Sequence, residues 1–485
     1  MKIILAFILL IASQLQAQIQ LKDSIFIKSL KKACEECLDS NNGLTSYSQT
    51  LTTLHLILPN IKAEKNAIKD NNHQILKDNY RTQADIDFSI FPKLEYLCIE
   101  GDLFTKITAW PSNLQALHLP ANFAYTKAFP ALPEKLRYLQ LGKDFSHSQE
   151  DKQLHFFDYQ NLPNSLEVLI IEQRTKLNQL NHLPNGLKVL TIKNNGYITK
   201  NLFSNLPNTL KVLRLDSCQL SNLPDKLPDS LTHLYAQFNS LKTLPSLPPT
   251  LQTLVVNHNL LTQIEGVDFP KLQKLDANYN KIQHLQLNAP NLSEVKVDSN
   301  QLDSLKIYSS KLKYLTCTNN RLQLLAVDKN APLQELYCQY NQLVELPLLS
   351  DSLQMLNCSH NLLIKLPPLG EKLHYIDYSG NKIRRAVQIP PNVQQAVSQT
   401  EEEIKDESKV WLYGKGYISI TIRRHYHRYR QKLAVLKTQK WEYEILLQDN
   451  PQDATAKLQV EKLAYQEQRL KRKYRRERAI FRDKS

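Results

Sequence analysis

The stretch that decides the fold is LPPTLQTLVVNHNLL, residues 247–261. It contains the spacing L-x-x-L-x-L, whose apolar residues here are Leu251, Leu254 and Val256. Successive side chains of a β-strand point to opposite faces, so this spacing predicts a short strand with those three residues turned inward. The residues expected to point outward are Thr253, Val255 and Asn257.

The same pattern recurs in steps of mostly 20 or 21 residues, with one longer step from Leu136 to Leu166. The leading residues of the fourteen copies are Leu94, Leu114, Leu136, Leu166, Leu187, Leu210, Leu231, Leu251, Leu272, Leu292, Leu312, Leu333, Leu353 and Leu373. One copy alone cannot bury its leucines, so stability must come from stacked neighbours, with strands about 4.8 Å apart. The period predicts an α/β solenoid, a horseshoe with a concave parallel β-sheet.

An asparagine follows the strand at a fixed offset in the later copies. These residues are Asn195, Asn239, Asn259, Asn280, Asn300, Asn320, Asn341, Asn361 and Asn381. A buried asparagine satisfies backbone groups where the chain leaves a sheet, so the row predicts an inward structural ladder rather than a ligand site. Early copies hold other residues in this slot, namely Asp102, Asp144, Arg174 and Cys218. We therefore expect a less regular solenoid before Leu187.

Leucine–proline pairs precede several strands, at Leu183-Pro184, Leu206-Pro207, Leu227-Pro228 and Leu247-Pro248. Proline fixes φ and lacks an N–H, which favours a mostly extended backbone over a helix on the convex side. Three copies lack the pair, and we expect the local curvature to change there. These copies begin at Leu292, Leu312 and Leu333.

The seven cysteines raise two questions. Cys34 and Cys37 either form a local disulfide in an oxidising compartment or lie unbonded on a short helix, and the sequence leaves both open. Cys317, Cys338 and Cys358 occupy the third inward position of consecutive copies. We interpret these three as small thiols that fill the core, because no fourth metal ligand converges on them. We predict no metal and no cofactor.

Four phrases resemble the short bacterial class of leucine-rich repeats, whose unit reads LPxxLxxLxLxxNxL. They are LPNTLKVLRLDSCQL, LPPTLQTLVVNHNLL, LQELYCQYNQLVELP and LQMLNCSHNLLIKLP. The class includes exported proteins of environmental bacteria and effectors delivered into host cells, and the resemblance implies a leucine-rich-repeat horseshoe that recognises proteins through its sheet. Some such effectors end in a ubiquitin-ligase domain with a catalytic cysteine. No cysteine follows Cys358 here, so that activity is not implied.

Outward strand positions should line the concave surface, which is the usual binding face of a solenoid. Tyrosine and arginine dominate interface energetics, so aromatic and charged residues at these positions are the candidate anchors. They are Arg214, Tyr235, Lys274, Asp276, Lys296, Tyr314, Tyr337 and Tyr375. The alternative is that the tyrosines only contact one another across the sheet. No phosphate-binding loop or Ser-His-Asp arrangement is present, so we predict no catalytic residues and no enzyme activity.

The N-terminus is typical of a secretory signal. Lys2 precedes the apolar run 3–12, which is too short to span a bilayer, and cleavage after Ala17 fits the small and polar residues there. The alternative is a buried N-terminal helix. We expect an exported protein that is periplasmic, bound to the cell surface or extracellular. Residues 18–92 lack the repeat, and we predict a partly helical cap there.

The C-terminal flank differs from the repeats in periodicity and charge. Two apolar stripes with steps of three and four residues, separated by Asn450-Pro451, predict an antiparallel helical hairpin. From Ala386 to Ser485 there are 21 Lys and Arg against 13 Asp and Glu, a net of +8 out of +14 for the whole chain. The candidate residues for an anionic partner are Arg423, Arg424, Arg428, Arg430, Lys471, Arg472, Lys473, Arg475 and Arg476. Three interpretations compete: solvated helix faces, docking to an acidic protein or anionic membrane, and nucleic-acid binding, which ranks last.

The sequence therefore predicts five segments. They are a signal peptide (1–17), an N-terminal cap (18–92), a leucine-rich-repeat domain (93–385), a linker (386–406) and a basic helical hairpin (407–485). The leading hypothesis is a secreted, non-enzymatic protein that binds a protein or peptide through its concave sheet. The alternative is an effector or surface-associated protein whose basic tail binds an anionic membrane, an acidic protein or nucleic acid.

Overall fold

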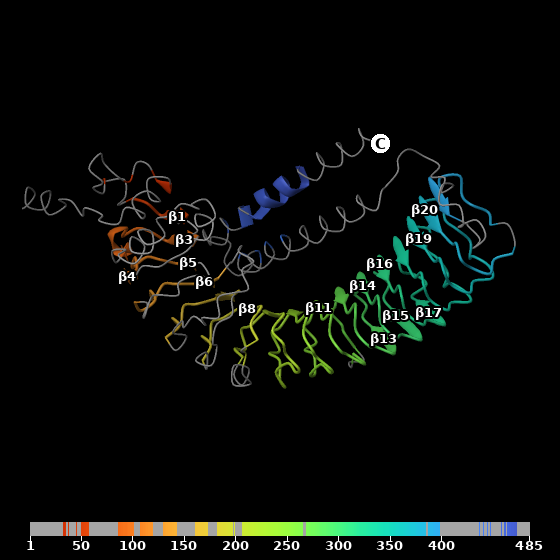
Figure 1. The fold of residues 1–485 in the computed structure, drawn as a ribbon, viewed down its shortest axis with the longest axis horizontal. Coiled ribbons are helices and arrows are strands. Elements are labelled where there is room, and N and C mark those ends of the chain that lie inside the picture. Colours follow the sequence, from red (N-terminus) through yellow and green to blue (C-terminus); the bar gives the residue numbers. More distant parts are fainter. Residues whose placement is uncertain are drawn as a thin grey trace, which may run out of the picture. The chain divides into compact units, whose positions relative to one another are not determined.

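The computed structural model divides into two units, Met1–Leu210 and Lys211–Ser485 (Figure 1). The structure describes residues 33, 34, 37, 45, 50–57, 86–100, 107–119, 130–142, 161–172, 182–196, 198, 206–264, 268–384, 387–397, 436, 440, 444, 447, 457, 460–461 and 463–472. No helix in this part of the chain is long and apolar enough to cross a membrane. The predicted signal segment, 1–17, lies outside the described residues.

The first unit contains a parallel β-sheet whose strands follow one another in chain order. The strands are β1 (Thr53–Ile57), β3 (Tyr96–Glu100), β5 (Ala116–Leu119), β6 (Tyr138–Leu141), β7 (Val168–Ile171) and β8 (Val189–Lys193). A leading leucine of the repeat precedes each strand from β3 to β8. Two short strands, β2 (Ile86–Asp87) and β4 (Ile107–Ala109), form a separate parallel pair, and the 3-10 helix η3 (Phe88–Ile90) follows β2.

The second unit repeats this plan with greater regularity. Its main sheet contains β9 (Val212–Asp216), β10 (His233–Tyr235), β11 (Thr253–Val255), β12 (Lys274–Asp276), β14 (Glu294–Lys296), β16 (Tyr314–Thr316), β18 (Glu335–Tyr337), β19 (Met355–Asn357), β20 (Tyr375–Asp377) and β21 (Gln395–Val397). Neighbouring strands pair in parallel, so that Lys274 lies opposite Glu294 and Glu294 opposite Tyr314. The constant step sets this register, because each copy places the same strand position beside its predecessor.

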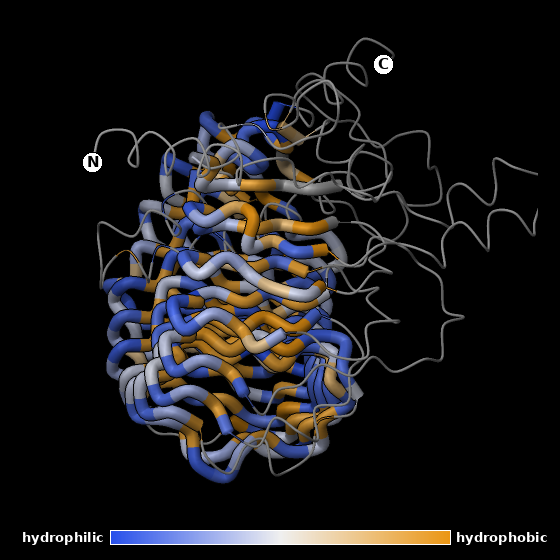
Figure 2. Tube along the Cα trace, turned by 90° about the vertical axis from the view of Figure 1, so that its left-hand side faces the viewer, coloured by the Kyte–Doolittle hydropathy of each residue, from blue (hydrophilic) through white to orange (hydrophobic). Residues whose placement is uncertain are grey.

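The leucines of the repeat form the core, as the spacing predicted. Leu251, Leu254 and Val256 are at most 1% exposed. Figure 2 shows apolar stretches recurring from turn to turn, with hydrophilic residues between them. Full burial of one such side chain stabilises the fold by roughly 1.5–3 kcal/mol, so the core gains its stability by adding copies.

The asparagine ladder also forms as predicted. The side-chain Oδ1 of Asn259 accepts a hydrogen bond from the N–H of Leu241 at 3.0 Å, and its Nδ2 donates to the carbonyls of Ala236 and Val256 at 2.9 and 3.0 Å. The same pattern recurs at Asn280, Asn300, Asn320, Asn341, Asn361 and Asn381. Each asparagine side chain therefore links the turn of its own copy to the backbone of the preceding copy.

A second sheet lies on the side of the second unit opposite its main sheet (Figure 1). Its three parallel strands are β13 (His284–Asn288), β15 (Ser304–Tyr308) and β17 (Leu324–Val327). They precede the three copies that lack the leucine–proline pair, so the chain on this side is a sheet there. The change of local curvature that we expected at these copies stays a prediction. The described proline-bearing copies stay extended on this side without forming such a ladder.

The repeat extends past both of its predicted ends. β1 pairs in register with β3, and Leu51, Leu54 and Leu56 carry the spacing L-x-x-L-x-L. Our prediction that residues 18–92 lack the repeat is therefore wrong at β1. At the other end, β21 pairs with β20 inside the predicted linker. Val393 and Ala396 replace the leucines of the pattern in that copy, which hid it from a leucine template.

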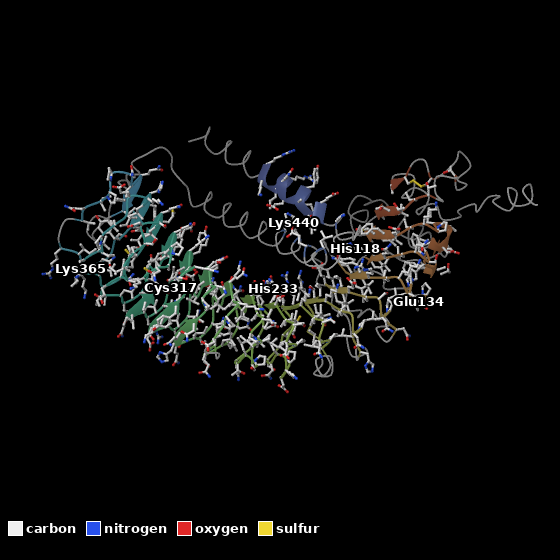
Figure 3. The ribbon with its side chains drawn as sticks, turned by 180° about the vertical axis from the view of Figure 1, so that it is seen from behind. His118, Glu134, His233, Cys317, Lys365 and Lys440 are labelled. Atoms are coloured by element: carbon white, nitrogen blue, oxygen red, sulfur yellow. A yellow bond between two sulfur atoms is a disulfide. The ribbon has the colours of Figure 1, made fainter. Side chains whose placement is uncertain are left out.

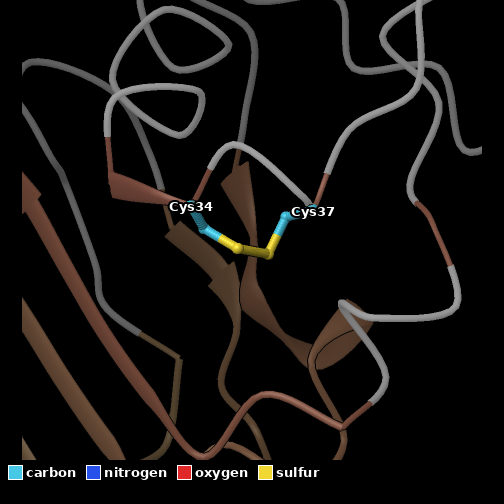
Figure 4. The surroundings of a disulfide bond; sticks show 2 residues. All are labelled: Cys34 and Cys37. Carbon is cyan, nitrogen blue, oxygen red and sulfur yellow. A yellow bond between two sulfur atoms is a disulfide. The ribbon is translucent and has the colours of Figure 1, made fainter.

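The structure decides whether the two N-terminal cysteines are bonded, and it describes one short helix in the C-terminal flank. Cys34 and Cys37 are joined by a disulfide bond (Figure 4). In the C-terminal flank, residues 463–472 are helical, which confirms a short helix. The antiparallel hairpin that we predicted for 407–485 stays a prediction, because too few of its residues are described to show a second helix packed against the first.

Candidate partner-binding face

The main sheet of the second unit presents polar and aromatic side chains on its outer side. We use the name outward face for the outward-pointing side chains of the copies containing β12, β14, β16, β18, β19 and β20. On these strands the central inward residue, such as Leu275 or Leu315, is buried, whereas the outward residues are half-buried or exposed. Six of the predicted anchors belong to this face: Lys274, Asp276, Lys296, Tyr314, Tyr337 and Tyr375.

Lysines and carboxylates form a charged cluster at the start of the outward face. Glu294 on β14 accepts a hydrogen bond from Lys296 on the same strand and forms an ion pair with Lys274 on β12 at 3.4 Å. Burial opposes ionisation of Glu294, but the two ammonium groups outweigh it and hold its pKa below the ordinary value. Burial raises the pKa of Asp276, against the opposing effect of the same lysines. Opposite charges therefore largely compensate one another here.

Farther along, the outward face carries carboxylates that are held by neutral donors. Asp298 accepts hydrogen bonds from the hydroxyl of Thr316 at 2.8 Å and from the N–H of Thr318 at 2.7 Å. Glu335 and Asp377 follow on β18 and β20. Glu294, Asp298 and Glu335 were not among the anchors predicted from the sequence. Their only sequence signal is that they occupy the same outward positions as the predicted anchors.

The tyrosines of this face contact their neighbours and still expose ring surface. Tyr314 is 38% exposed, and its hydroxyl donates to Gln334 at 3.1 Å. It lies in register between Glu294 and Glu335. The hydroxyl of Tyr337 donates to Glu335 at 3.3 Å. These contacts are to polar neighbours and do not bury Tyr314, and the alternative that the tyrosines contact one another across the sheet stays open.

Two predicted anchors are not on an accessible surface. Arg214 and Tyr235 point outward from β9 and β10 but are only 5% and 8% exposed, with the guanidinium carbon 4.0 Å from the centre of the tyrosine ring. Our expectation that they are exposed anchors is wrong, because the outward side chains of β9 to β11 are buried like the inward ones. Burial, together with the charge of Arg214, lowers the pKa of His233 to about 3 (Figure 3).

Sequence reasoning missed a row of aromatic rings in the turns that follow the strands. Phe238, His258 and Tyr279 stack with ring centres 4.4 and 4.3 Å apart, and Tyr340 stacks on His360 at 4.5 Å. All five have φ between 51° and 57°, a conformation that costs a non-glycine residue free energy. Stacking with the neighbouring copies offsets part of this cost. The sequence did contain a signal for this row, because each of the five rings immediately precedes a ladder asparagine.

The cysteines of three consecutive copies lie in the core of the second unit, as we interpreted them (Figure 3 labels Cys317). Cys317, Cys338 and Cys358 are fully buried, and burial raises the pKa of each thiol well above its ordinary value. A protonated thiol is a poor metal ligand. Within the described residues, no group of three or more His, Cys, Asp or Glu side chains is placed to hold a metal ion.

Of the predicted residues for an anionic partner, only Lys471 and Arg472 are described. Lys471 forms an ion pair with Glu467, one turn earlier on the same helix. The remaining candidates, Arg423, Arg424, Arg428, Arg430, Lys473, Arg475 and Arg476, lie outside the described residues. The role of the basic tail therefore stays a prediction.

No family model and no curated protein matches this chain. Among solved structures, YopM from Yersinia enterocolitica WA-314 is 27% identical, with a TM-score of 0.52. The match covers 64% of this chain and 64% of that one, which is less than two thirds of the YopM chain. YopM from Yersinia pestis, a leucine-rich effector protein, is 22% identical over 70% of this chain and 96% of its own, with a TM-score of 0.41. The internalin inlF from Listeria monocytogenes is 16% identical over 78% and 95%, with a TM-score of 0.44.

Proposed function

Because the chain is a leucine-rich-repeat protein that resembles bacterial leucine-rich-repeat effectors, we propose that it binds a protein or peptide partner on its outward face. In this proposal the protein is exported and has no catalytic activity. One observation carries it: aromatic and charged side chains stand in register from β12 to β20 and remain half-buried or exposed.

The composition of the outward face supports this role. Protein interfaces are rich in tyrosine and methionine at their centre, and Tyr314, Tyr337, Met355 and Tyr375 occupy neighbouring outward positions here. The side chains stand on paired strands rather than on loops, so little conformational entropy is lost when a partner binds. The disulfide between the two N-terminal cysteines supports the export part of the proposal, because such bonds persist in oxidising compartments.

The test compares opposite sides of two neighbouring copies. Tyr314 on the outward face and Tyr308 on the second sheet are 38% and 48% exposed, so Tyr308→Ala is a matched control for Tyr314→Ala. We expect partners recovered with the intact chain to be recovered equally well with Tyr308→Ala. With Tyr314→Ala, recovery should fall about tenfold, because loss of an aromatic anchor at an interface costs on the order of 1–2 kcal/mol.

Equal recovery with both variants would show that the partner uses another surface. The competing hypothesis assigns binding to the basic segment, 407–485. It predicts recovery that is insensitive to Tyr314→Ala and that collapses when salt is raised from low to physiological concentration.

A further inference from the structure

The carboxylates of the outward face differ in the charges around them. Glu294 lies between two lysines, Lys274 and Lys296. Three other carboxylates have no ion pair with a lysine or arginine among the described residues: Asp298, Glu335 and Asp377. The outward positions on β16, β18, β19 and β20 contain no lysine or arginine at all. This part of the face is therefore acidic within a chain of net charge +14.

Neutral groups hold the three carboxylates in place. The hydroxyl of Tyr337 donates to Glu335, and the N–H and hydroxyl of Ser379 donate to Asp377 at 3.1 and 2.7 Å. Asp298 is held by two threonines in the same way, and burial raises its pKa. Such hydrogen bonds orient a carboxylate without adding a positive charge, so Glu335 and Asp377 are positioned to receive a cation. The charge of Lys296 already acts on Asp298.

A side-chain acceptor without a donor lies among these carboxylates. The Oε1 atom of Gln339, which follows β18, is buried and has no hydrogen-bond partner in the described part of the molecule. A buried acceptor that lacks a donor costs about 1–3 kcal/mol. An arginine or lysine side chain brings N–H donors and no acceptor, which suits a surface that offers acceptors in excess.

The solenoid already shows how an arginine packs on a tyrosine of the outward side. The guanidinium of Arg214 lies 4.0 Å from the ring centre of Tyr235. Tyr314 exposes 38% of its surface beside Glu335 and offers an incoming cation a ring face next to a carboxylate.

We propose that the outward face from Asp298 to Asp377 binds a basic, extended segment of a partner protein. Arginine or lysine side chains of this segment pair with Glu335 and Asp377. This inference rests on the proposed function and adds the charge of the partner to it. Because the whole chain is strongly basic, general electrostatics repel a polycation, and binding of one requires a local acidic site.

The test uses the full chain and a fluorescein-labelled octa-arginine peptide, with binding followed by fluorescence anisotropy. We expect octa-arginine to bind and an octa-glutamate peptide to bind far more weakly. The double variant Glu335→Gln with Asp377→Asn should bind octa-arginine at least about tenfold more weakly. The matched control, Glu345→Gln with Asp351→Asn, removes the same charge from exposed residues outside the outward face and should change the affinity less than about twofold.

Each other outcome overturns the inference. If both double variants bound octa-arginine equally more weakly, the peptide would be attracted by the general charge of the surface and not by this site. Absence of octa-arginine binding would exclude a basic partner, while the proposed function would stand if Tyr314→Ala still lowered recovery of the natural partner. Carbodiimide coupling to octa-lysine gives a second readout, and cross-links from Glu335 or Asp377 to this peptide support the site. Cross-links only to lysines of residues 407–485 in the same chain would assign the face to the chain's own basic segment.

Discussion

Two kinds of turn occur on the side of the second unit that lies opposite its main sheet. Six residues after the ladder position, some copies carry proline, as at Pro224, Pro245, Pro347 and Pro367. Three of the four copies between Pro245 and Pro347 carry Gln286, Lys306 and Ala326, which pair in register in β13, β15 and β17. These three have an N–H to donate to a parallel ladder, whereas proline has none. The difference teaches that one residue per copy decides whether this side becomes a sheet.

The largest effect should come from the asparagine ladder, which supports both kinds of turn. Asn300→Ala, before β15, and Asn361→Ala, before Pro367, each remove three hydrogen bonds to buried backbone groups. The two carbonyls keep a donor from a neighbouring ladder asparagine, whereas the N–H of Ile282 or Leu343 loses its acceptor. We expect each to lower the free energy of unfolding by about 3 kcal/mol in urea denaturation. Asn291→Ala, which removes an exposed hydrogen bond, is the control. A clearly smaller loss for Asn300→Ala would mean that the second sheet holds its turns without the ladder.

Placing proline in the central strand should convert one kind of turn into the other. Lys306→Pro removes an N–H from β15, whose two neighbours both pair with it. We expect a loss of about 2 kcal/mol and faster amide hydrogen exchange in β13 and β17. Lys306→Ala keeps the N–H and should leave exchange in these strands nearly unchanged. Unaltered exchange after Lys306→Pro would contradict the role that we assign to the missing proline.

Lowering the pH should change the stability near β10 and the stability near β12 and β14 in opposite directions. The pKa of His233, in β10, is about 3 in the folded chain, far below its ordinary value near 6.5. Between these two pH values the imidazole is protonated in the unfolded chain and neutral in the folded chain. Stability near β10 should therefore fall as the pH drops from about 6.5 toward 3, by at most about 1.4 kcal/mol per pH unit.

Asp276 and Asp298, near β12 and β14, behave in the opposite way. Their pKa values are raised, so they take up protons more readily when folded, and acid relieves the cost of burying their charge. His233→Gln should remove most of the acid sensitivity near β10 in hydrogen exchange at pH values of about 7 and 4.5. The exposed His374→Gln should not, and equal effects of the two variants would refute this assignment.

The smallest effect should come from removing the proline next to the second sheet. Pro347→Ala supplies an N–H at the position that corresponds to Ala326 of β17 in the next copy, which allows a fourth strand to begin. The new hydrogen bond and the lost rigidity of proline in the unfolded chain oppose one another, so stability should change by less than about 1 kcal/mol. Exchange at the new amide should nevertheless be slow. Fast exchange there would show that something other than proline ends the sheet.

The outward face was only partly predictable from the sequence. Strand alternation correctly placed Lys274, Lys296 and Tyr314 on its surface. The same alternation gives the direction of a side chain but not its exposure, which is why it failed for Arg214 and Tyr235. The second sheet was not predicted; the missing prolines at its copies led us to expect only a change of curvature. The stacked rings were overlooked because the template stopped at the asparagine.

By itself, the sequence determined the repeat, the inward leucines, the asparagine ladder and the parallel order of the strands. These features follow from a local period, since each copy can bury its apolar residues only against a neighbour of the same shape. Only the tertiary structure decided which outward residues are accessible, whether Cys34 and Cys37 are bonded, and which carboxylates lack a cation. Accessibility and the pairing of carboxylates depend on side chains about 20 residues apart or on other segments of the chain, which no local pattern encodes. Cys34 and Cys37 are only three residues apart, and their spacing fits both a bonded and an unbonded pair.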